Sequence, residues 1–178
     1  MSVSAPPLVL IGPMAAGKTR TGKRLARRLE LEFTDTDREV EAQHGPIPQI
    51  FAELGESAFR ELERAAVQQA IARGGVIAFG GGAVLHPDTQ NDLADCAVVY
   101  LSTTADAVAP RLDRGGRPLV ADGGLERWSE IYEARRAIYE RLGKIHLDTS
   151  RRPMESVVDE LLAWYRSRYA TDSGGNAE

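Results

Sequence analysis

The sequence predicts an α/β fold of three layers, in which helices cover both faces of a parallel sheet. Short β-branched runs alternate along the chain with longer segments of helical period, as in successive β-α-β units. Glycine-rich or charged clusters follow four of the five apolar runs. The 178 residues suit one domain with an ordinary core. We expect this domain over residues 8–169, between a flexible N-terminus of residues 1–7 and a flexible tail of residues 170–178.

Five strands are expected, at Leu8–Ile11, Glu32–Thr34, Val76–Phe79, Ala97–Leu101 and Lys144–Leu147. The segments between them carry apolar residues at helical spacing, which indicates helices that pack on the sheet. These residues are Leu25 and Leu29, then Phe59, Leu62, Ala66 and Ala70, and finally Val158, Leu161, Leu162 and Tyr165. Ligands of open parallel sheets bind outside the carboxyl ends of the strands, so functional residues should follow each strand.

Composition excludes several classes of function. The net charge is -4 and no basic block is present, so we expect no nucleic-acid partner. No signal peptide is evident and no apolar run approaches the roughly 18 residues of a membrane span, which favours a cytoplasmic protein without a membrane partner. The single cysteine, Cys96, lies in an apolar run and is expected to be a buried hydrophobe. A monomer is the default expectation.

A phosphate-binding loop follows the first strand. Residues Gly12 to Thr19 fit the pattern Gly-x-x-x-x-Gly-Lys-Ser/Thr, in which backbone N–H groups surround phosphate oxygens at the start of a helix. Lys18 would reach the β- and γ-phosphates of ATP, and the hydroxyl of Thr19 would bind Mg²⁺. A chance turn would not be preceded by a strand and followed by a helical pattern.

Two carboxylates follow the second strand. Asp35 and Asp37 are two residues apart, which in an extended segment directs both side chains to the same side. Asp37 could serve only as the N-cap of the next helix. A second carboxylate near a phosphate loop favours another role, which is to organise the metal ion and orient an acceptor hydroxyl.

Arg60 lies in a helical segment that is expected to begin near Glu56. An arginine flanked by glutamates is usually an exposed ion-pair partner, but Glu63, three residues later, could hold the guanidinium against an anionic substrate. The three glycines at 80–82 follow a buried strand, where a ligand-facing loop is favoured over a simple tight turn.

A segment rich in arginine and glycine spans residues 111–124 and resembles a mobile lid. Closure of such a lid would exclude water, and Arg117 next to Pro118 could stabilise charge on the transferring phosphate. The alternative is a solvated loop, which fits Arg111 or Arg114 individually. The following helix contains Arg135 and Arg136, of which one should face the site.

Together these motifs resemble the shikimate kinase family in identity, order and spacing, over about residues 8–165. The resemblance implies a P-loop kinase with a sheet of order 2-3-1-4-5 and a mobile lid. It also implies transfer of the ATP γ-phosphate to the 3-hydroxyl of shikimate, on the route to chorismate and the aromatic amino acids. The implied substrate-binding region is about residues 35–62.

The resemblance also implies roles for individual residues. Catalysis would depend on Lys18, Asp37 and Arg117. Shikimate would be bound by Asp37, Arg60, Gly81, Gly82 and Arg136, with the two arginines on its carboxylate and with Phe51 and Phe59 as an aromatic wall. The nucleotide would contact Met14, Ala15, Ala16, Gly17, Lys18, Thr19, Arg111, Arg117, Arg152 and Pro153. Thr19 would bind Mg²⁺ directly, and Asp35 would do so through water.

The chain departs from the family in three places. The loop interior from Pro13 to Ala16 lacks the usual extra glycine and serine, the segment from His44 to Ile50 is one residue short, and the lid is short between Arg111 and Arg117. Two other functions remain as alternatives: a related small-molecule kinase such as a gluconate kinase, and a nucleotide-dependent binding module without catalysis.

Overall fold

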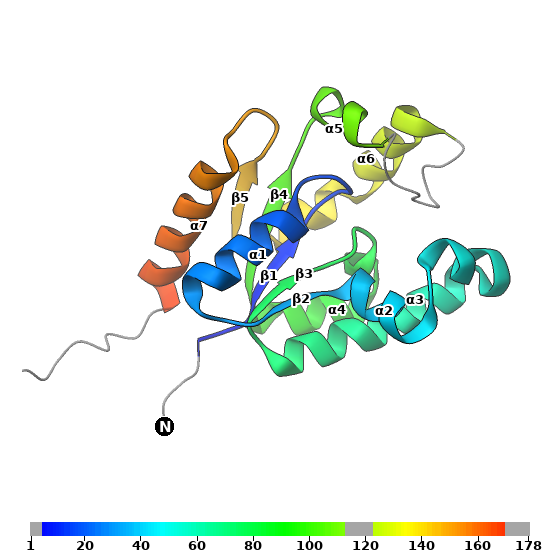
Figure 1. Ribbon diagram of the computed structural model, residues 1–178, viewed down its shortest axis with the longest axis horizontal. Helices are drawn as coiled ribbons and strands as arrows, with labels where there is room; N and C mark the ends of the chain where they lie inside the picture. The colour runs from blue at the N-terminus through cyan, green and yellow to red at the C-terminus, as the bar shows by residue number, and fades with distance from the viewer. Residues whose placement is uncertain (1–4, 113–122, 170–178) are drawn as a thin grey trace, which may run out of the picture.

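The protein is described by a computed structural model over residues 5–112 and 123–169. Its strands form one parallel sheet in the order β2-β3-β1-β4-β5, which confirms the predicted order (Figure 1). They are β1 Leu8–Ile11, β2 Phe33–Asp35, β3 Val76–Ala78, β4 Ala97–Ser102 and β5 Ile145–Asp148. In this register Leu8 of β1 pairs with Val76 on one side and with Ala97 on the other.

The chain order places a helix after each strand, and the loops that precede these helices lie at the carboxyl edge of the sheet. The helices are α1 Lys18–Leu29, α2 Thr36–His44, α3 Ile47–Arg73, α4 Pro87–Asp92, α5 Ala105–Leu112, α6 Gly124–Leu142 and α7 Met154–Tyr169. Short 3-10 turns are found at Ala83–Leu85 and Leu93–Asp95. None of the helices in the described ranges is long and apolar enough to span a membrane.

Alternate side chains of β1 pack into two separate hydrophobic cores, one on each face of the sheet. Leu8 and Leu10 pack with α1 and α7, whereas Val9 and Ile11 pack with α3 and α6. This division follows from the strand geometry, in which successive side chains point to opposite faces of the sheet. Figure 1 shows the result, with α1 and α7 on one side of the sheet and α6 on the other.

The helix α3 is interrupted at Gly55, whose φ of 82° and ψ of 173° are not helical. The sequence predicts a helix from about Glu56, and the part after the break agrees with that prediction. The preceding stretch, from Ile47 to Leu54, is helical as well and was not expected. Its Ile50 joins Val40 of α2 in a small core of its own, apart from the sheet.

The N-terminal segment joins the fold at two prolines. The carbonyl of Pro6 accepts a hydrogen bond from Tyr165 of α7 at 2.8 Å, and that of Pro7 accepts one from the backbone of Ala97 at 2.8 Å. The predicted tail at 170–178 and most of the predicted lid lie outside the described residues. Cys96 is 1% exposed, in agreement with its predicted role as a buried hydrophobe.

Candidate active site

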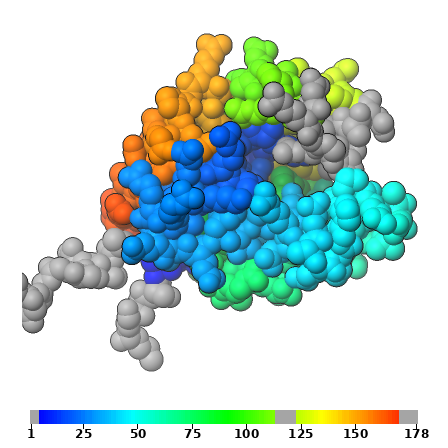
Figure 2. Space-filling view, in the orientation of Figure 1, coloured from blue at the N-terminus to red at the C-terminus, as the bar shows by residue number. Residues whose placement is uncertain are grey.

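A cavity of about 800 Å³ opens at the carboxyl edge of the sheet. Its volume is within the range of small-molecule sites. Figure 2 shows the molecule hollowed between α1, the α2–α3 region and α5. The walls come from the phosphate loop, from the starts of α1 and α2, from α3, from the glycines after β3 and from α6. The cavity therefore lies where the sequence predicts the functional residues.

The phosphate loop is shaped by its first glycine and held by its lysine. Gly12 has a φ of 144°, and a Cβ at this position would collide with the backbone of Leu101 in β4. The ammonium group of Lys18 donates hydrogen bonds to the carbonyls of Gly12 and Pro13, at 2.8 and 2.7 Å. These bonds place the positive charge over the loop, at the start of α1, where a helix N-terminus also favours an anion.

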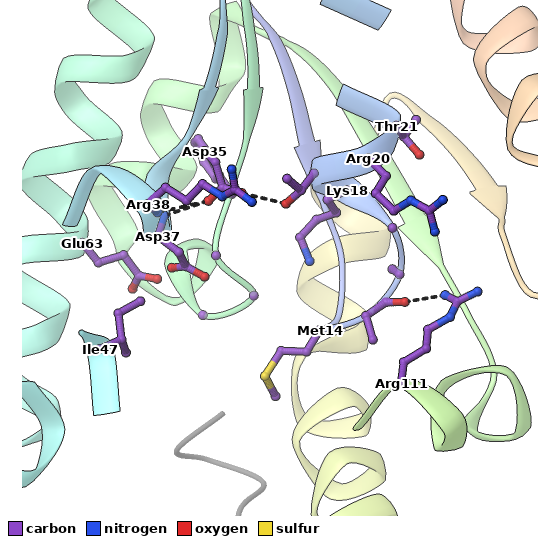
Figure 3. A pocket seen from close by; sticks show the side chains of 18 of the residues that line it. Met14, Lys18, Arg20, Thr21, Asp35, Asp37, Arg38, Ile47, Glu63 and Arg111 are labelled. Atoms are coloured by element: carbon purple, nitrogen blue, oxygen red, sulfur yellow. Dashed lines mark hydrogen bonds between the residues drawn. The ribbon is translucent and has the colours of Figure 1, made fainter. Parts of the chain in front are cut away.

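Asp35 joins the end of β2 to the phosphate loop. One of its carboxylate oxygens accepts hydrogen bonds from the backbone N–H groups of Asp37 and Arg38, at 3.1 and 3.3 Å. The other oxygen accepts a bond from the hydroxyl of Thr19 at 2.6 Å. Asp35, not Asp37, is thus the N-cap of α2. The side chain of Asp37 lines the cavity (Figure 3).

A buried cluster of charges closes the far end of the cavity. Glu63 is 3% exposed and pairs with Arg60 at 2.7 Å, while Arg135 of α6 is 8% exposed. Burial raises the pKa of Glu63, and the charges of Arg60 and Arg135 counteract that effect. All three side chains line the cavity. The buried carboxylate of Glu63 thus pairs with the guanidinium of Arg60 and lies near that of Arg135, an arrangement suited to binding an anion.

Tyr139 links this cluster to the glycine loop. Its hydroxyl donates a hydrogen bond to the carbonyl of Gly81 at 2.6 Å and lies near the charge of Arg135. Burial raises the pKa of Tyr139 to about 12, so the phenol stays protonated and continues to donate. The loop after β3 is thereby fixed to α6.

Two of the three glycines at 80–82, Gly80 and Gly82, are needed for close approach. A Cβ on Gly80 would lie 2.8 Å from a carboxylate oxygen of Glu63, and one on Gly82 would lie 2.6 Å from the guanidinium carbon of Arg60. The sequence predicts a ligand-facing loop here. All three glycines line the cavity, and charged side chains also lie against Gly80 and Gly82. Larger residues would push those side chains out of place.

Phe51 and Phe59 form an apolar wall beside the cluster. Their ring centroids are 4.8 Å apart, and both line the cavity. The guanidinium of Arg60 lies 5.3 Å from the ring centroid of Phe59, within the range of a cation–π contact. The anion-binding end of the cavity therefore has both a charged and an apolar side.

Comparison with known proteins identifies the family. The family model described as Shikimate kinase matches residues 14–166. A shikimate kinase of Streptomyces coelicolor is 43% identical over 163 residues, covering 90% of this chain and 95% of the relative, and one of Rhodococcus erythropolis is 41% identical, covering 89% and 96%. The solved shikimate kinase of Acinetobacter baumannii in complex with shikimate superposes with a TM-score of 0.87 at 31% identity, covering 92% of this chain and 94% of that one. The chain belongs to the shikimate kinase family.

A gluconokinase of Sinorhizobium meliloti is more distant, with a TM-score of 0.64 at 21% identity, and its likeness concerns the fold alone. Shikimate kinases and this gluconokinase thus share an architecture. The fold alone therefore does not distinguish a shikimate kinase from a gluconate kinase. The distinction depends on the residues at the anion-binding end of the cavity.

Arg136, which the sequence predicts in the acceptor site, lies elsewhere in the structure. Arg136 does not line the cavity; it is exposed on α6 and pairs with Glu133 and Glu140. Its neighbour Arg135 occupies the cavity instead. Adjacent residues on a helix point about 100° apart, so only one of the two can face the site. The prediction that one of the two arginines faces the site is confirmed, and the one that does so is Arg135, not Arg136.

Most residues predicted to bind the nucleotide line the same cavity, away from the cluster of Arg60, Glu63 and Arg135. Arg111 donates a hydrogen bond to the carbonyl of Ala15 at 2.8 Å (Figure 3), and Arg152 pairs with Glu160 at 2.7 Å. Both line the cavity, together with Met14, Ala15, Ala16, Gly17, Lys18 and Thr19. Pro153 is next to Arg152 but does not line it. The predicted catalytic residue Arg117 lies outside the described residues.

Two contacts that hold the phosphate loop from outside were not predicted. The hydroxyl of Thr149, after β5, donates a hydrogen bond to the carbonyl of Ala16 at 2.9 Å, and the indole N–H of Trp128 donates one to the carbonyl of Met14 at 2.9 Å. These bonds join segments more than 100 residues apart, so local sequence patterns carry no signal for them. Arg135 does have a signal, because it falls four residues after Ile131 and four before Tyr139 on the buried stripe of α6.

Proposed function

We propose that this protein transfers the γ-phosphate of ATP to the 3-hydroxyl of shikimate, yielding shikimate 3-phosphate and ADP. The observation that carries the proposal is the buried cluster of Arg60, Glu63 and Arg135 at the far end of the cavity from the phosphate loop. A phosphate loop alone is shared by many kinases. A second site for an anion in the same cavity indicates an acceptor that carries a carboxylate.

The acceptor is bound at the anion-binding end. Arg60 and Arg135 hold its carboxylate, because a guanidinium presents paired donors that match the two oxygens. Phe51 and Phe59 pack against the apolar side of its ring. Asp37, together with the backbone of Gly81 and Gly82, lies between these groups and the phosphate loop and orients the reacting hydroxyl.

ATP is bound by the phosphate loop, with Lys18 at its β- and γ-phosphates and with the side chains of Arg111 and Arg152 near the nucleoside. Arg117 would stabilise charge on the transferring phosphate, a role that rests on the sequence motif alone. Pro153 would contact the adenine, again on the basis of the motif. The nucleotide and the acceptor thus approach Lys18 from opposite sides.

Mg²⁺ fits the pair formed by Thr19 and Asp35. Their oxygens lie 2.6 Å apart beside the phosphate loop, and a hydroxyl with a carboxylate is a donor set that this hard cation accepts. We assign the hydroxyl of Thr19 as a direct ligand and Asp35 as a ligand through water. When bound, Mg²⁺ neutralises charge on the β- and γ-phosphates.

The chain's residues act by positioning and by electrostatic stabilisation. The acceptor oxygen forms a bond to the γ-phosphorus while the bond from that phosphorus to the bridging oxygen of ADP breaks. Asp37 accepts the hydrogen bond of the hydroxyl and takes up its proton as the new ester forms. Lys18 stabilises the negative charge that develops on the phosphate oxygens. ADP and shikimate 3-phosphate are then released.

The proposal is tested by following ADP release with ATP and Mg²⁺, using shikimate, quinate and gluconate as acceptors. We expect turnover with shikimate, and a severe loss of that turnover in Asp37→Ala with an unchanged melting temperature. If only gluconate supported turnover, the acceptor would be gluconate and not shikimate. ADP binding without any turnover would favour a binding module. We also propose that the protein is a cytoplasmic monomer, which fractionation and light scattering would test.

A further inference from the structure

The phosphate loop is held from outside by a buried tryptophan. The indole N–H of Trp128, in the first turns of α6, donates a hydrogen bond to the carbonyl of Met14 at 2.9 Å. Trp128 is 2% exposed and packs with Val108 and Ile131, and the side chains of Met14 and Ala15 pack against this group. The contact therefore joins the core beneath α5 and α6 directly to the backbone of the loop.

The hydrogen bond fixes the orientation of one peptide group. In a trans peptide the C=O and the N–H point in opposite directions. Trp128 does not line the cavity, whereas Met14 and Ala15 do. With the carbonyl of Met14 turned toward Trp128, the N–H of Ala15 is turned toward the cavity, where a phosphate loop presents its N–H groups to the anion.

The backbone at this peptide needs such support. Ala15 has a φ of 65°, in the left-handed region that residues with a Cβ adopt at a cost in energy. Glycine would adopt it freely, but the interior of this loop, from Pro13 to Ala16, contains no glycine. A strained conformation persists only where its surroundings impose it. Trp128 provides a buried, directional contact at the residue before the strained one.

We infer that Trp128 is a positioning residue for the nucleotide: its indole N–H holds the Met14–Ala15 peptide in the orientation that binds phosphate. The inference rests on the proposed binding of ATP at this loop. Trp128 takes no part in the transfer itself and acts only through the backbone. Its loss should therefore affect nucleotide affinity more than acceptor affinity.

The decisive variant is Trp128→Phe, which keeps an aromatic ring in the core and removes the donor. We expect the Kd of ADP, measured by calorimetry without acceptor, to rise about five- to tenfold, as for the loss of one hydrogen bond. The KM of shikimate should stay within about twofold. The matched control is Trp164→Phe on α7, the other tryptophan of the chain, which should leave the Kd of ADP unchanged.

A second substitution separates positioning from general stability. Adding Ala15→Gly to Trp128→Phe should restore most of the lost ADP affinity, because glycine adopts the positive φ without an external hold. An unchanged Kd in Trp128→Phe would overturn the inference. So would a loss of ADP affinity that Ala15→Gly does not restore and that parallels a lower melting temperature, since this indicates a packing role alone.

A measurement on the native indole keeps the test valid if Trp128→Phe does not fold. In an NMR spectrum of Trp164→Phe, the remaining indole N–H signal belongs to Trp128. We expect this signal to exchange slowly with solvent and to shift when ADP is added. A signal that saturating ADP leaves in place would overturn the inference. ADP binding without turnover of shikimate would contradict only the proposed function.

Discussion

The adjacent arginines of α6 provide the sharpest test of the proposed acceptor site. Arg135 is 8% exposed and lies near Tyr139 and Glu63, whereas Arg136 is exposed and pairs with glutamates of its own helix. A charge-assisted hydrogen bond contributes about 1.5–3 kcal/mol. Because each 1.4 kcal/mol is about a factor of ten, Arg135→Ala should raise the KM of shikimate by about 10- to 150-fold.

Arg136→Ala serves as the matched control. It removes the same side chain one position along the same helix, so it should leave the KM of shikimate within about twofold. Initial rates at varied shikimate and saturating ATP measure the effect, and the KM of ATP should be unchanged in both variants. Removing Arg135 leaves Glu63 with Arg60 as its nearby cation, so melting temperatures must accompany the kinetics. A large effect of Arg136→Ala together with a small effect of Arg135→Ala would refute the assignment.

Three further predictions follow from burial, close packing and charge. Gly82→Ala should displace the guanidinium of Arg60 and raise the KM of shikimate with little change in melting temperature. In steady-state kinetics, the double variant Gly82→Ala with Arg60→Ala should raise this KM by less than the two single effects combined. Cys96, whose pKa burial raises to about 11, should react with a thiol reagent at pH 8 only after unfolding in urea; rapid labelling of the native protein would contradict its placement. Hydrogen bonds from Ser150 lower the pKa of Asp148 below its ordinary 3.8, so this carboxylate stabilises the fold above that pH and loses its effect as the pH falls through the lowered value. Asp148→Asn should therefore lower the melting temperature slightly at pH 7, and by less as the pH falls below 3.8; a loss that does not shrink with falling pH would contradict this account.

Local patterns made most of the architecture predictable. The strands of the sheet are short apolar runs, and all five were expected within one residue of their observed bounds. The phosphate loop and Asp35 were predictable because their chemistry depends on residues that are close in sequence. The helical stretch from Ile47 to Leu54 was not expected. Its prolines, Pro46 at the N-cap and Pro48 in the first turn, stand where a helix tolerates them.

The charge cluster was only partly predictable, because its geometry depends on how α3 and α6 pack. The spacing of Arg60 and Glu63 suggested an ion pair, but the sequence could not indicate that both are shielded from solvent. The choice between Arg135 and Arg136 depends on the rotation of α6 about its axis, which the positions of Trp128 and Tyr139 determine. Contacts such as that of Trp128 with Met14 depend on tertiary packing throughout.

The interruption of α3 has a consequence for the acceptor pocket. Phe51 and Phe59 are eight residues apart, which in an unbroken helix would separate them by about 12 Å along the axis. The turn at Gly55 instead folds the chain back, so that the two rings meet at 4.8 Å. A Cβ at Gly55 would meet no atom within 4 Å, so what excludes other residues there is the backbone angle alone. The aromatic wall thus depends on a residue that contributes no side chain to it, and a survey of substitutions that scores only contacts would judge this position neutral.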